Sequence, residues 1–179
     1  MDRLFGLPYC EMDIDVDKIF IEYETEKRWA SFTPTSYFKE NIVPQDSLVY
    51  ILEKIKDFTN GFVSSPHTLE LINIWANEYS HKDFQESHIH GNSDLSFVIF
   101  KEIEKEKNRL SFFSPAYELI QTRDFWQDDA VSIERNIDCG ATQGQMVIFP
   151  SFIRHMVYPN QSDEKRITYS GNIEIGIIK

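Results

Sequence analysis

Short apolar runs that alternate with polar positions fill the chain after residue 68. A period of two places alternate side chains on the same face of a β-strand. Eight runs are expected to form strands: residues 69–77, 95–100, 109–113, 131–134, 145–149, 156–158, 166–170 and 173–178. Many short strands in close succession, with no helix-length segment between them, predict an antiparallel sandwich or barrel.

The first 68 residues have a mixed pattern. Residues 19–23 alternate apolar and polar side chains and are expected to form a strand. A helix is expected next, because five apolar residues recur at helical spacing: Leu48, Ile51, Leu52, Ile55 and Phe58. Asp46 or Ser47 offers an N-cap oxygen, and Asn60-Gly61 offers a stop. The apolar stripe of this helix should pack on the outside of the sheet.

Composition agrees with one β-rich globular domain. Hydrophobic residues make up 41% of the chain and aromatic residues 14%. We expect a single domain over residues 1–179, in which strands and a helix in residues 1–68 flank a β core in residues 69–179. The 29 acidic and 18 basic residues give a net charge of −11. Nucleic acid is therefore an unfavourable partner, since phosphate contacts need clustered lysine and arginine.

Cys10 and Cys139 supply neither a disulfide framework nor a metal-binding spacing. No secretory signal pattern starts the sequence, and no apolar run approaches the ~20 residues of a membrane span. The sequence therefore predicts a cytoplasmic protein with no membrane partner.

Three of the five histidines form a candidate metal site. His88 and His90 lie in Ser-His-Ile-His-Gly, and positions i and i+2 of a strand point to the same face. The turn-like residues 91–94 place the pair at a strand end. His155 follows the expected strand at 145–149, after Pro150 has ended it. Each feature alone is also typical of packed or exposed histidines, but together they predict a catalytic metal with open coordination positions.

Arg166 is a candidate partner for a carboxylate-bearing cosubstrate. A planar guanidinium binds a carboxylate through two parallel charge-assisted hydrogen bonds. Thr168 faces the same way, and Asn77 and Tyr79 are expected to reach the same pocket from an adjoining strand. The alternative is an exposed arginine after a turn at residues 163–165.

The motifs together resemble one enzyme family. They are Trp75-Ala-Asn77, His88-Ile-His90-Gly, Leu95-Ser96, Gly144-Gln-Met-Val-Ile-Phe-Pro-Ser151, His155 and Arg166-Ile-Thr-Tyr-Ser-Gly-Asn172. They look like the 2-oxoglutarate- and Fe(II)-dependent oxygenases, in particular a bacterial and phage branch of the prolyl-hydroxylase-like superfamily. The resemblance covers roughly residues 69–175. It implies a double-stranded β-helix, the cupin-like jelly roll, with iron in its mouth.

Carried over by residue, the resemblance matches His88 and His155 to the two iron-binding histidines and Arg166 to the residue that binds 2-oxoglutarate, and we expect His90 to be the third Fe(II) ligand. It implies that dioxygen is consumed and that a protein side chain or a small molecule is hydroxylated. His90 is a departure, because the wider superfamily has Asp or Glu there, and a third neutral imidazole leaves the metal more positive. Nearby carboxylates are candidate replacements: Asp94, which is the best placed, Glu86 and Asp83.

Two further departures are Gly91, where the family has proline, and Phe97, where it has glycine. Phe97 either narrows the pocket or points outward. Phe125 and Trp126 lie in an expected loop that either covers the mouth or packs at its rim. Two other functions stay open: a cupin-like metal protein that does not use 2-oxoglutarate, and a barrel without metal. Whether the chain forms a homodimer also stays open.

Overall fold

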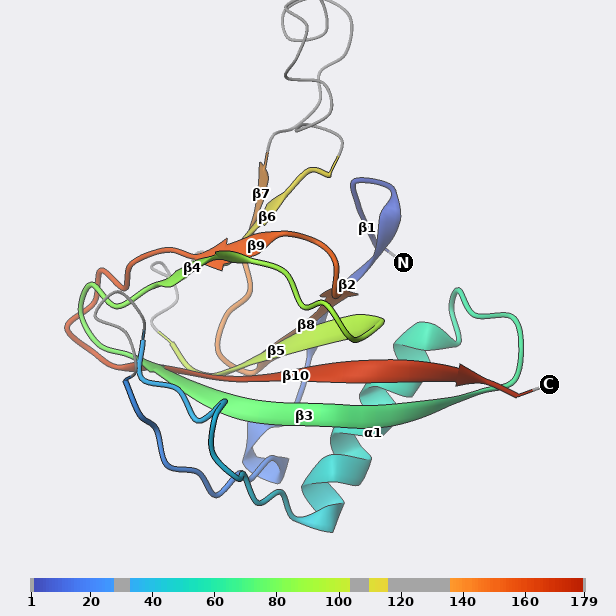
Figure 1. Ribbon diagram of the computed structural model, residues 1–179, viewed down its shortest axis with the longest axis horizontal. Helices are drawn as coiled ribbons and strands as arrows, with labels where there is room; N and C mark the ends of the chain where they lie inside the picture. The colour runs from blue at the N-terminus through green and yellow to red at the C-terminus, as the bar shows by residue number, and fades with distance from the viewer. Residues whose placement is uncertain (1, 28–32, 104–109, 116–135, 179) are drawn as a thin grey trace, which may run out of the picture.

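Two antiparallel sheets form the core of the protein (Figure 1). The computed structural model describes residues 2–27, 33–103, 110–115 and 136–178. The large sheet contains, in spatial order, β1 (Asp2–Leu4), β2 (Leu7–Asp13), β8 (Gln145–Pro150), β5 (Leu95–Glu102), β10 (Arg166–Ile177) and β3 (His67–Tyr79). The small sheet contains β4 (Gln85–His88), β9 (His155–Val157), β6 (Leu110–Phe113) and β7 (Asn136–Cys139). Two facing antiparallel sheets of this kind form the expected jelly roll.

The strands of the large sheet separate apolar from polar side chains. On β10, Ile167, Tyr169 and Ile173 pack in the apolar core on one side of the sheet. The alternate residues Thr168 and Ser170 face the other side, where the small sheet lies. This alternation brings the polar residues of β10 and β3 into the space between the sheets.

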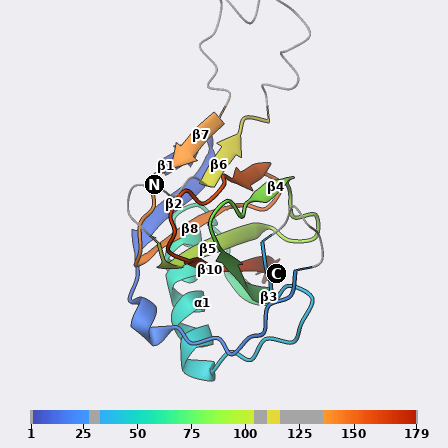
Figure 2. The same ribbon diagram turned by 90° about the vertical axis from the view of Figure 1, so that its left-hand side faces the viewer.

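Helix α1 (Gln45–Thr59) covers the outer face of the large sheet (Figures 1 and 2). Its expected position is confirmed, and so is its end at Asn60, but the expected N-cap is wrong. Pro44 is the N-cap residue and makes no side-chain cap. The Ser47 hydroxyl instead accepts a hydrogen bond from the Phe20 N–H at 3.0 Å and donates one to the Lys18 carbonyl at 2.9 Å.

Residues 19–23 do not form the expected strand. Ile19 and Ile21 are buried in the core beneath α1, so their alternation reflects packing against the helix. Glu22 makes an isolated bridge with Ile42, and this bridge replaces a strand ladder. A short 3₁₀ turn, η1 (Val16–Lys18), precedes the segment.

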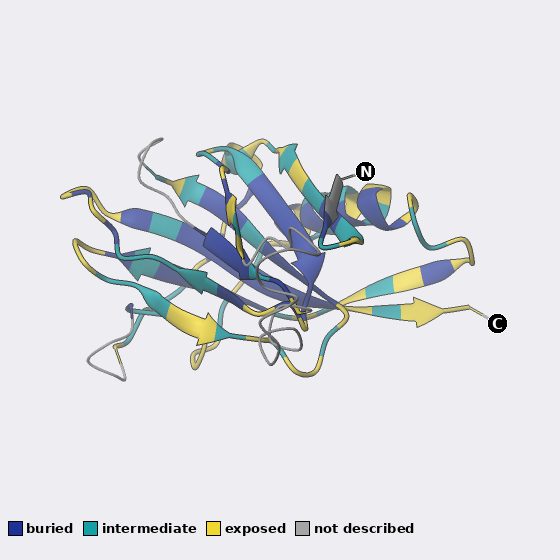
Figure 3. Cartoon of the chain, turned by 90° about the horizontal axis from the view of Figure 1, so that it is seen from above, coloured by how far each residue is buried: buried dark blue, intermediate teal, exposed yellow. Residues whose placement is uncertain are grey.

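A second core lies between the two sheets and is rich in aromatic residues. Phe112 of β6 meets Phe149 of β8 with ring centroids 4.8 Å apart, and Tyr9 of β2 meets Phe112 at 5.6 Å. Figure 3 shows the buried strands at the centre and the exposed end of the long β3–β10 ribbon beyond them. This core holds the two sheets at the spacing that forms the site.

Most of the expected strands are observed, with altered bounds. The runs at 166–170 and 173–178 form one strand, β10, whose pairing with β3 is irregular between Asn172 and Ile173. Strands β1, β2 and β7 were not expected, the strand expected to end at the histidine pair is β4, and the run at 131–134 lies outside the described residues. In the described part of the chain, no helix has the length and apolarity to cross a bilayer.

Candidate functional site

Two histidines of the small sheet and one that follows it closely converge at one point. Antiparallel pairing of β4 with β9 places His88 directly opposite His155. His90 follows β4, and its N–H donates to the Ser151 carbonyl at 2.9 Å. One ligand nitrogen from each ring lies within 4.8 Å of the other two. The structure therefore brings together all three predicted metal ligands.

Hydrogen bonds at Nδ1 determine which nitrogen each ring presents. The Nδ1 atom of His88 lies 2.6 Å from the Glu86 carbonyl, and that of His155 lies 2.9 Å from the Ile153 carbonyl. A carbonyl only accepts, so in each ring Nδ1 carries the proton and Nε2 keeps its lone pair. Such contacts fix the tautomer and orientation of a metal ligand.

His90 is oriented by a side chain instead. Its Nδ1 lies 2.6 Å from the Asn172 Oδ1, which also accepts from the Ser96 hydroxyl at 2.8 Å. The Asn172 amide nitrogen donates to the Asn73 Oδ1 at 2.8 Å, and this contact determines which way the amide points. Asn172 therefore holds the His90 Nε2 lone pair toward the other two rings.

Burial keeps the three rings neutral. It lowers the pKa of His88 to about 4, with a smaller lowering contribution from His90. It lowers the pKa of His90, and it places the pKa of His155 well below 6.5, where the two neighbouring histidines act in the same direction. Neutral imidazole is the form that binds metal, so no proton has to leave at neutral pH.

The candidate carboxylates lie elsewhere. Asp94 Oδ2 accepts from the Ile175 N–H at 2.7 Å, and Asp83 accepts from the Ser80 N–H and pairs with Lys27 at 2.9 Å. Among the described residues, the metal-competent group consists of the three histidines alone, without Asp94, Asp83 or Glu86. Three imidazole donors with open positions suit Fe(II), so the residues present fit the metal.

A cavity of about 470 Å³ opens beside the histidines between the two sheets. His88, His90 and His155 lie in its wall. Polar side chains of β3 and β10 line one part of it: Asn73, Asn77, Tyr79, Thr168, Ser170 and Asn172. Apolar side chains of the inner core line another: Val98, Phe100, Leu110 and Val157. A small molecule that enters this cavity reaches the candidate metal position.

Three of the four predicted cosubstrate residues lie in the cavity wall. They are Asn77, Tyr79 and Thr168. Arg166 is buried and not in the wall: its Nη2 donates to the Tyr158 carbonyl at 3.3 Å, and its guanidinium lies 4.1 Å from the Tyr79 ring centroid. The alternative of an exposed arginine is therefore wrong, and Tyr79 separates Arg166 from the cavity.

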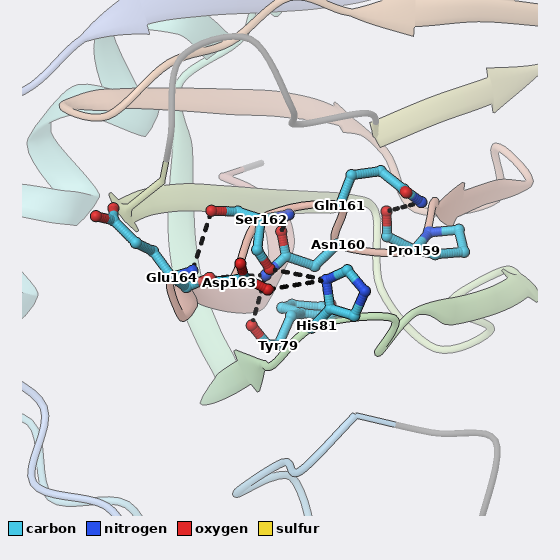
Figure 4. A network of polar contacts seen from close by, with 8 residues as sticks. All are labelled: Tyr79, His81, Pro159, Asn160, Gln161, Ser162, Asp163 and Glu164. Atoms are coloured by element: carbon cyan, nitrogen blue, oxygen red, sulfur yellow. Dashed lines mark hydrogen bonds and ion pairs between the residues drawn. The ribbon is translucent and has the colours of Figure 1, made fainter.

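A loop network that the sequence did not reveal supports this end of the cavity (Figure 4). The Asn160 amide donates to the Tyr79 carbonyl at 3.0 Å and to the Glu164 carbonyl at 2.9 Å. Its backbone N–H donates to the Asp83 carbonyl. His81 lies at the surface of the same network, 3.6 Å from Asp163. Asn160 thus joins the loops that follow β3 and β9 behind Tyr79 and Arg166.

Gly91 and Phe97, the two further departures from the family pattern, lie in different parts of the structure. Phe97 points away from the cavity into the core beneath α1, so it does not narrow the pocket. Gly91 lines the cavity near His90. Phe125 and Trp126 lie outside the described residues.

A family model described as "Putative 2OG-Fe(II) oxygenase" matches residues 73–172, more than half of the chain. A search of curated protein sequences gives no match.

Solved structures share the fold at low sequence identity. The 2-oxoglutarate-dependent carbocyclase SnoK from nogalamycin biosynthesis is 11% identical, with a TM-score of 0.60 over 93% of this chain and 79% of that one. HygX from Streptomyces hygroscopicus, crystallised with nickel, 2-oxoglutarate and hygromycin B, is 8% identical, with a TM-score of 0.60 over 94% and 83%. A prolyl-4-hydroxylase from Pseudomonas putida is 13% identical, with a TM-score of 0.56 over 94% and 93%. The expected double-stranded β-helix is thereby confirmed.

Proposed function

The chain belongs to the 2OG-Fe(II) oxygenases, and we propose that His88, His90 and His155 bind its Fe(II). One observation carries this proposal: the three rings converge while each Nδ1 is held by another group. The Nε2 atoms are therefore free to bind, and the cavity gives access to the open side. An Fe(II) ion held by three neutral imidazoles would keep both of its positive charges, which would favour an anionic cosubstrate beside it.

We infer that 2-oxoglutarate occupies the part of the cavity between the histidines and Tyr79. The Tyr79 and Thr168 side chains line this part, and the buried Arg166 adds positive charge behind the Tyr79 ring. Burial raises the pKa of Tyr79, although the nearby Arg166 acts in the opposite direction, so Tyr79 stays a protonated donor. Asn77 donates to the Ser170 hydroxyl at 3.4 Å and contributes a neutral polar surface.

When bound, Fe(II) with 2-oxoglutarate and dioxygen supplies oxidation coupled to decarboxylation of the cosubstrate to succinate and CO2. The protein's contribution is positional. Asn172 and two backbone carbonyls orient the imidazoles. Tyr79 and Thr168 would receive the distal carboxylate, and Arg166 would add positive charge from behind the Tyr79 ring. The apolar residues Val98 and Phe100 exclude water from the inner wall. The proposed reaction is hydroxylation of a substrate C–H bond, in a protein side chain or a small molecule.

Metal binding and cosubstrate turnover test this function separately. Purified protein is titrated with Fe(II) without oxygen, and succinate is then measured with 2-oxoglutarate and air. We expect one Fe(II) per chain and succinate formation, both lost in His155→Ala. His81→Gln is the matched control, because the His81 side chain is exposed and does not line the cavity. Stoichiometric Fe(II) without any 2-oxoglutarate affinity would instead favour a cupin-like metal protein.

A further inference from the structure

The outer part of the cavity has an exposed apolar mouth. Four large hydrophobic side chains in its wall are between 38% and 48% exposed: Tyr37, Phe38, Ile72 and Ile89. Scattered exposed apolar residues are ordinary, but a cluster around one opening indicates a binding surface. From this cluster we propose that the primary substrate is an uncharged, ring-bearing small molecule. This inference rests on the proposed function, because it concerns the substrate of the same site.

Aromatic rings form a continuous wall from the mouth to the metal site. The Tyr37 ring packs edge-on against Phe38 at 5.1 Å and against Trp75 at 4.9 Å. The Trp75 ring in turn lies 5.6 Å from the His90 ring. A ring that enters along this wall gains face or edge contacts over its whole path. The wall therefore directs a flat substrate toward the reacting position.

The segment that carries Tyr37 and Phe38 is fastened to β3. The Ser36 N–H donates to the Ala76 carbonyl at 2.9 Å, and the Ala76 N–H donates to the Ser36 hydroxyl at 2.8 Å. The Asn41 amide donates to the Ile74 carbonyl at 3.0 Å. These bonds hold the segment on both sides of the two rings, so the mouth is formed before a substrate arrives.

The described wall of the cavity has no lysine, arginine, aspartate or glutamate side chain. Its polar groups are amides, hydroxyls and imidazoles. A charged substrate group would lose its water in this wall without a counter-ion, which is strongly unfavourable. The anionic 2-oxoglutarate does not meet this penalty, because a bound metal and the positive charge of Arg166 behind Tyr79 would offset its two carboxylates. The outer part of the cavity therefore favours a neutral molecule.

Size favours a small molecule over a folded protein surface. The volume of about 470 Å³ is within the range of small-molecule sites and must also hold the cosubstrate. Three probes of similar size separate the contributions: 2-naphthol, which is neutral, 2-naphthoate and 2-naphthylmethylammonium. Their dissociation constants are measured by calorimetry on the full chain with Ni(II) and 2-oxoglutarate. We expect 2-naphthol to bind at least about tenfold more tightly than either charged probe.

Variants at the mouth test where the probe binds. Ile72→Asp and Ile72→Lys should both weaken 2-naphthol binding at least about fivefold, because either charge loses water beside an apolar ligand. Val49→Asp is the matched control: Val49 is also exposed and apolar but lies on α1, away from the cavity. Equal binding of the three probes, the same loss in Val49→Asp, or tighter binding of a blocked apolar tetrapeptide would overturn the inference.

The same samples distinguish failure of the substrate inference from failure of the proposed function. For the wild type and each variant, the binding of metal and of 2-oxoglutarate is measured in the absence of the naphthyl probes. If 2-naphthol binds as expected but metal and 2-oxoglutarate do not, the apolar site stands and the oxygenase assignment of these residues fails. If both bind but 2-naphthol does not, the substrate inference alone fails.

Discussion

The His90 imidazole and the Asn172 amide share a 2.6 Å hydrogen bond between the end of β4 and strand β10. The two residues come from different sheets, so this bond ties the third candidate ligand to the large sheet. Ser96 and Asn73 fix the amide that makes it. The orientation of His90 therefore depends on a polar chain that crosses the large sheet from β5 to β10 and β3.

Replacing Asn172 should weaken metal binding without removing a ligand. Asn172→Leu keeps the branched shape of the side chain but loses the amide acceptor, so the His90 Nδ1 keeps only the Ser96 hydroxyl, 2.9 Å away, and the ring is held less firmly. We expect the dissociation constant for Co(II) or Fe(II) to rise about 10- to 100-fold. Asn172→Asp keeps an acceptor at the same place and should bind metal at least as tightly as the wild type. An unchanged constant in Asn172→Leu would contradict this role.

Replacing Arg166 should affect the cosubstrate and not the metal. Arg166→Met removes the buried positive charge behind the Tyr79 ring, and we expect the dissociation constant of 2-oxoglutarate to rise about tenfold through the lost electrostatic attraction. Arg166→Lys keeps the charge but loses the planar contact with the Tyr79 ring, and it should weaken 2-oxoglutarate binding less than Arg166→Met does. Calorimetry with Ni(II)-loaded protein gives the 2-oxoglutarate dissociation constant of each variant. Equal 2-oxoglutarate binding by all three proteins would remove Arg166 from the site.

The metal-free protein should lose stability in acid because of its histidines. The pKa of His88 is about 4 in the folded protein against 6.5 ordinarily, because the ring is buried. Between these values the unfolded chain binds a proton that the folded chain does not, so the free energy of unfolding falls as the pH falls through this window. His88 alone accounts for about 3 kcal/mol across it.

Urea denaturation at pH 7 and pH 5, without metal, measures this effect. His88→Gln should lose less stability than the wild type between the two pH values. His81→Gln should lose as much as the wild type, since His81 is a surface histidine. Identical losses in all three proteins would show that His88 does not contribute to the acid response.

Gly171 should tolerate no side chain. A Cβ there would lie 2.4 Å from the Phe97 Cζ and 2.9 Å from the Asn73 carbonyl oxygen, well inside contact distance. We expect Gly171→Ala to lower the free energy of unfolding by about 3 kcal/mol. Gly140→Ala is the control, because a Cβ at that position meets nothing within 4 Å. Equal urea midpoints for the two variants would show that Phe97 moves aside at no cost.

Features that depend on the local alternation of apolar and polar residues could be predicted from the sequence. The period of two predicted correctly that Thr168 reaches the cavity from β10. His88 and His90 both line the cavity, but β4 ends at His88, so the two do not share one face of a strand. Helical spacing correctly located α1. The strand predicted at residues 19–23 was wrong, because an extended segment whose alternate side chains pack against a helix has the same sequence pattern as a strand.

Other features depend on contacts between distant segments. The bond between Asn172 and His90 and the position of Arg166 behind Tyr79 arise only when β10 lies between β3 and β5. Asn160 joins two loops through backbone carbonyls, which any sequence supplies. The family resemblance supplied the role of Arg166, whereas its separation from the cavity needed the structure.

The fastening of residues 33–36 to β3 also has a consequence for association between chains. An uncovered outer strand of a sheet can pair with a strand of another molecule. Pro34 and Ser36 already take the backbone bonds of Glu78 and Ala76 that such a strand would need. A second chain therefore cannot extend the large sheet over this stretch of β3, and the approach to the aromatic mouth stays open to small molecules.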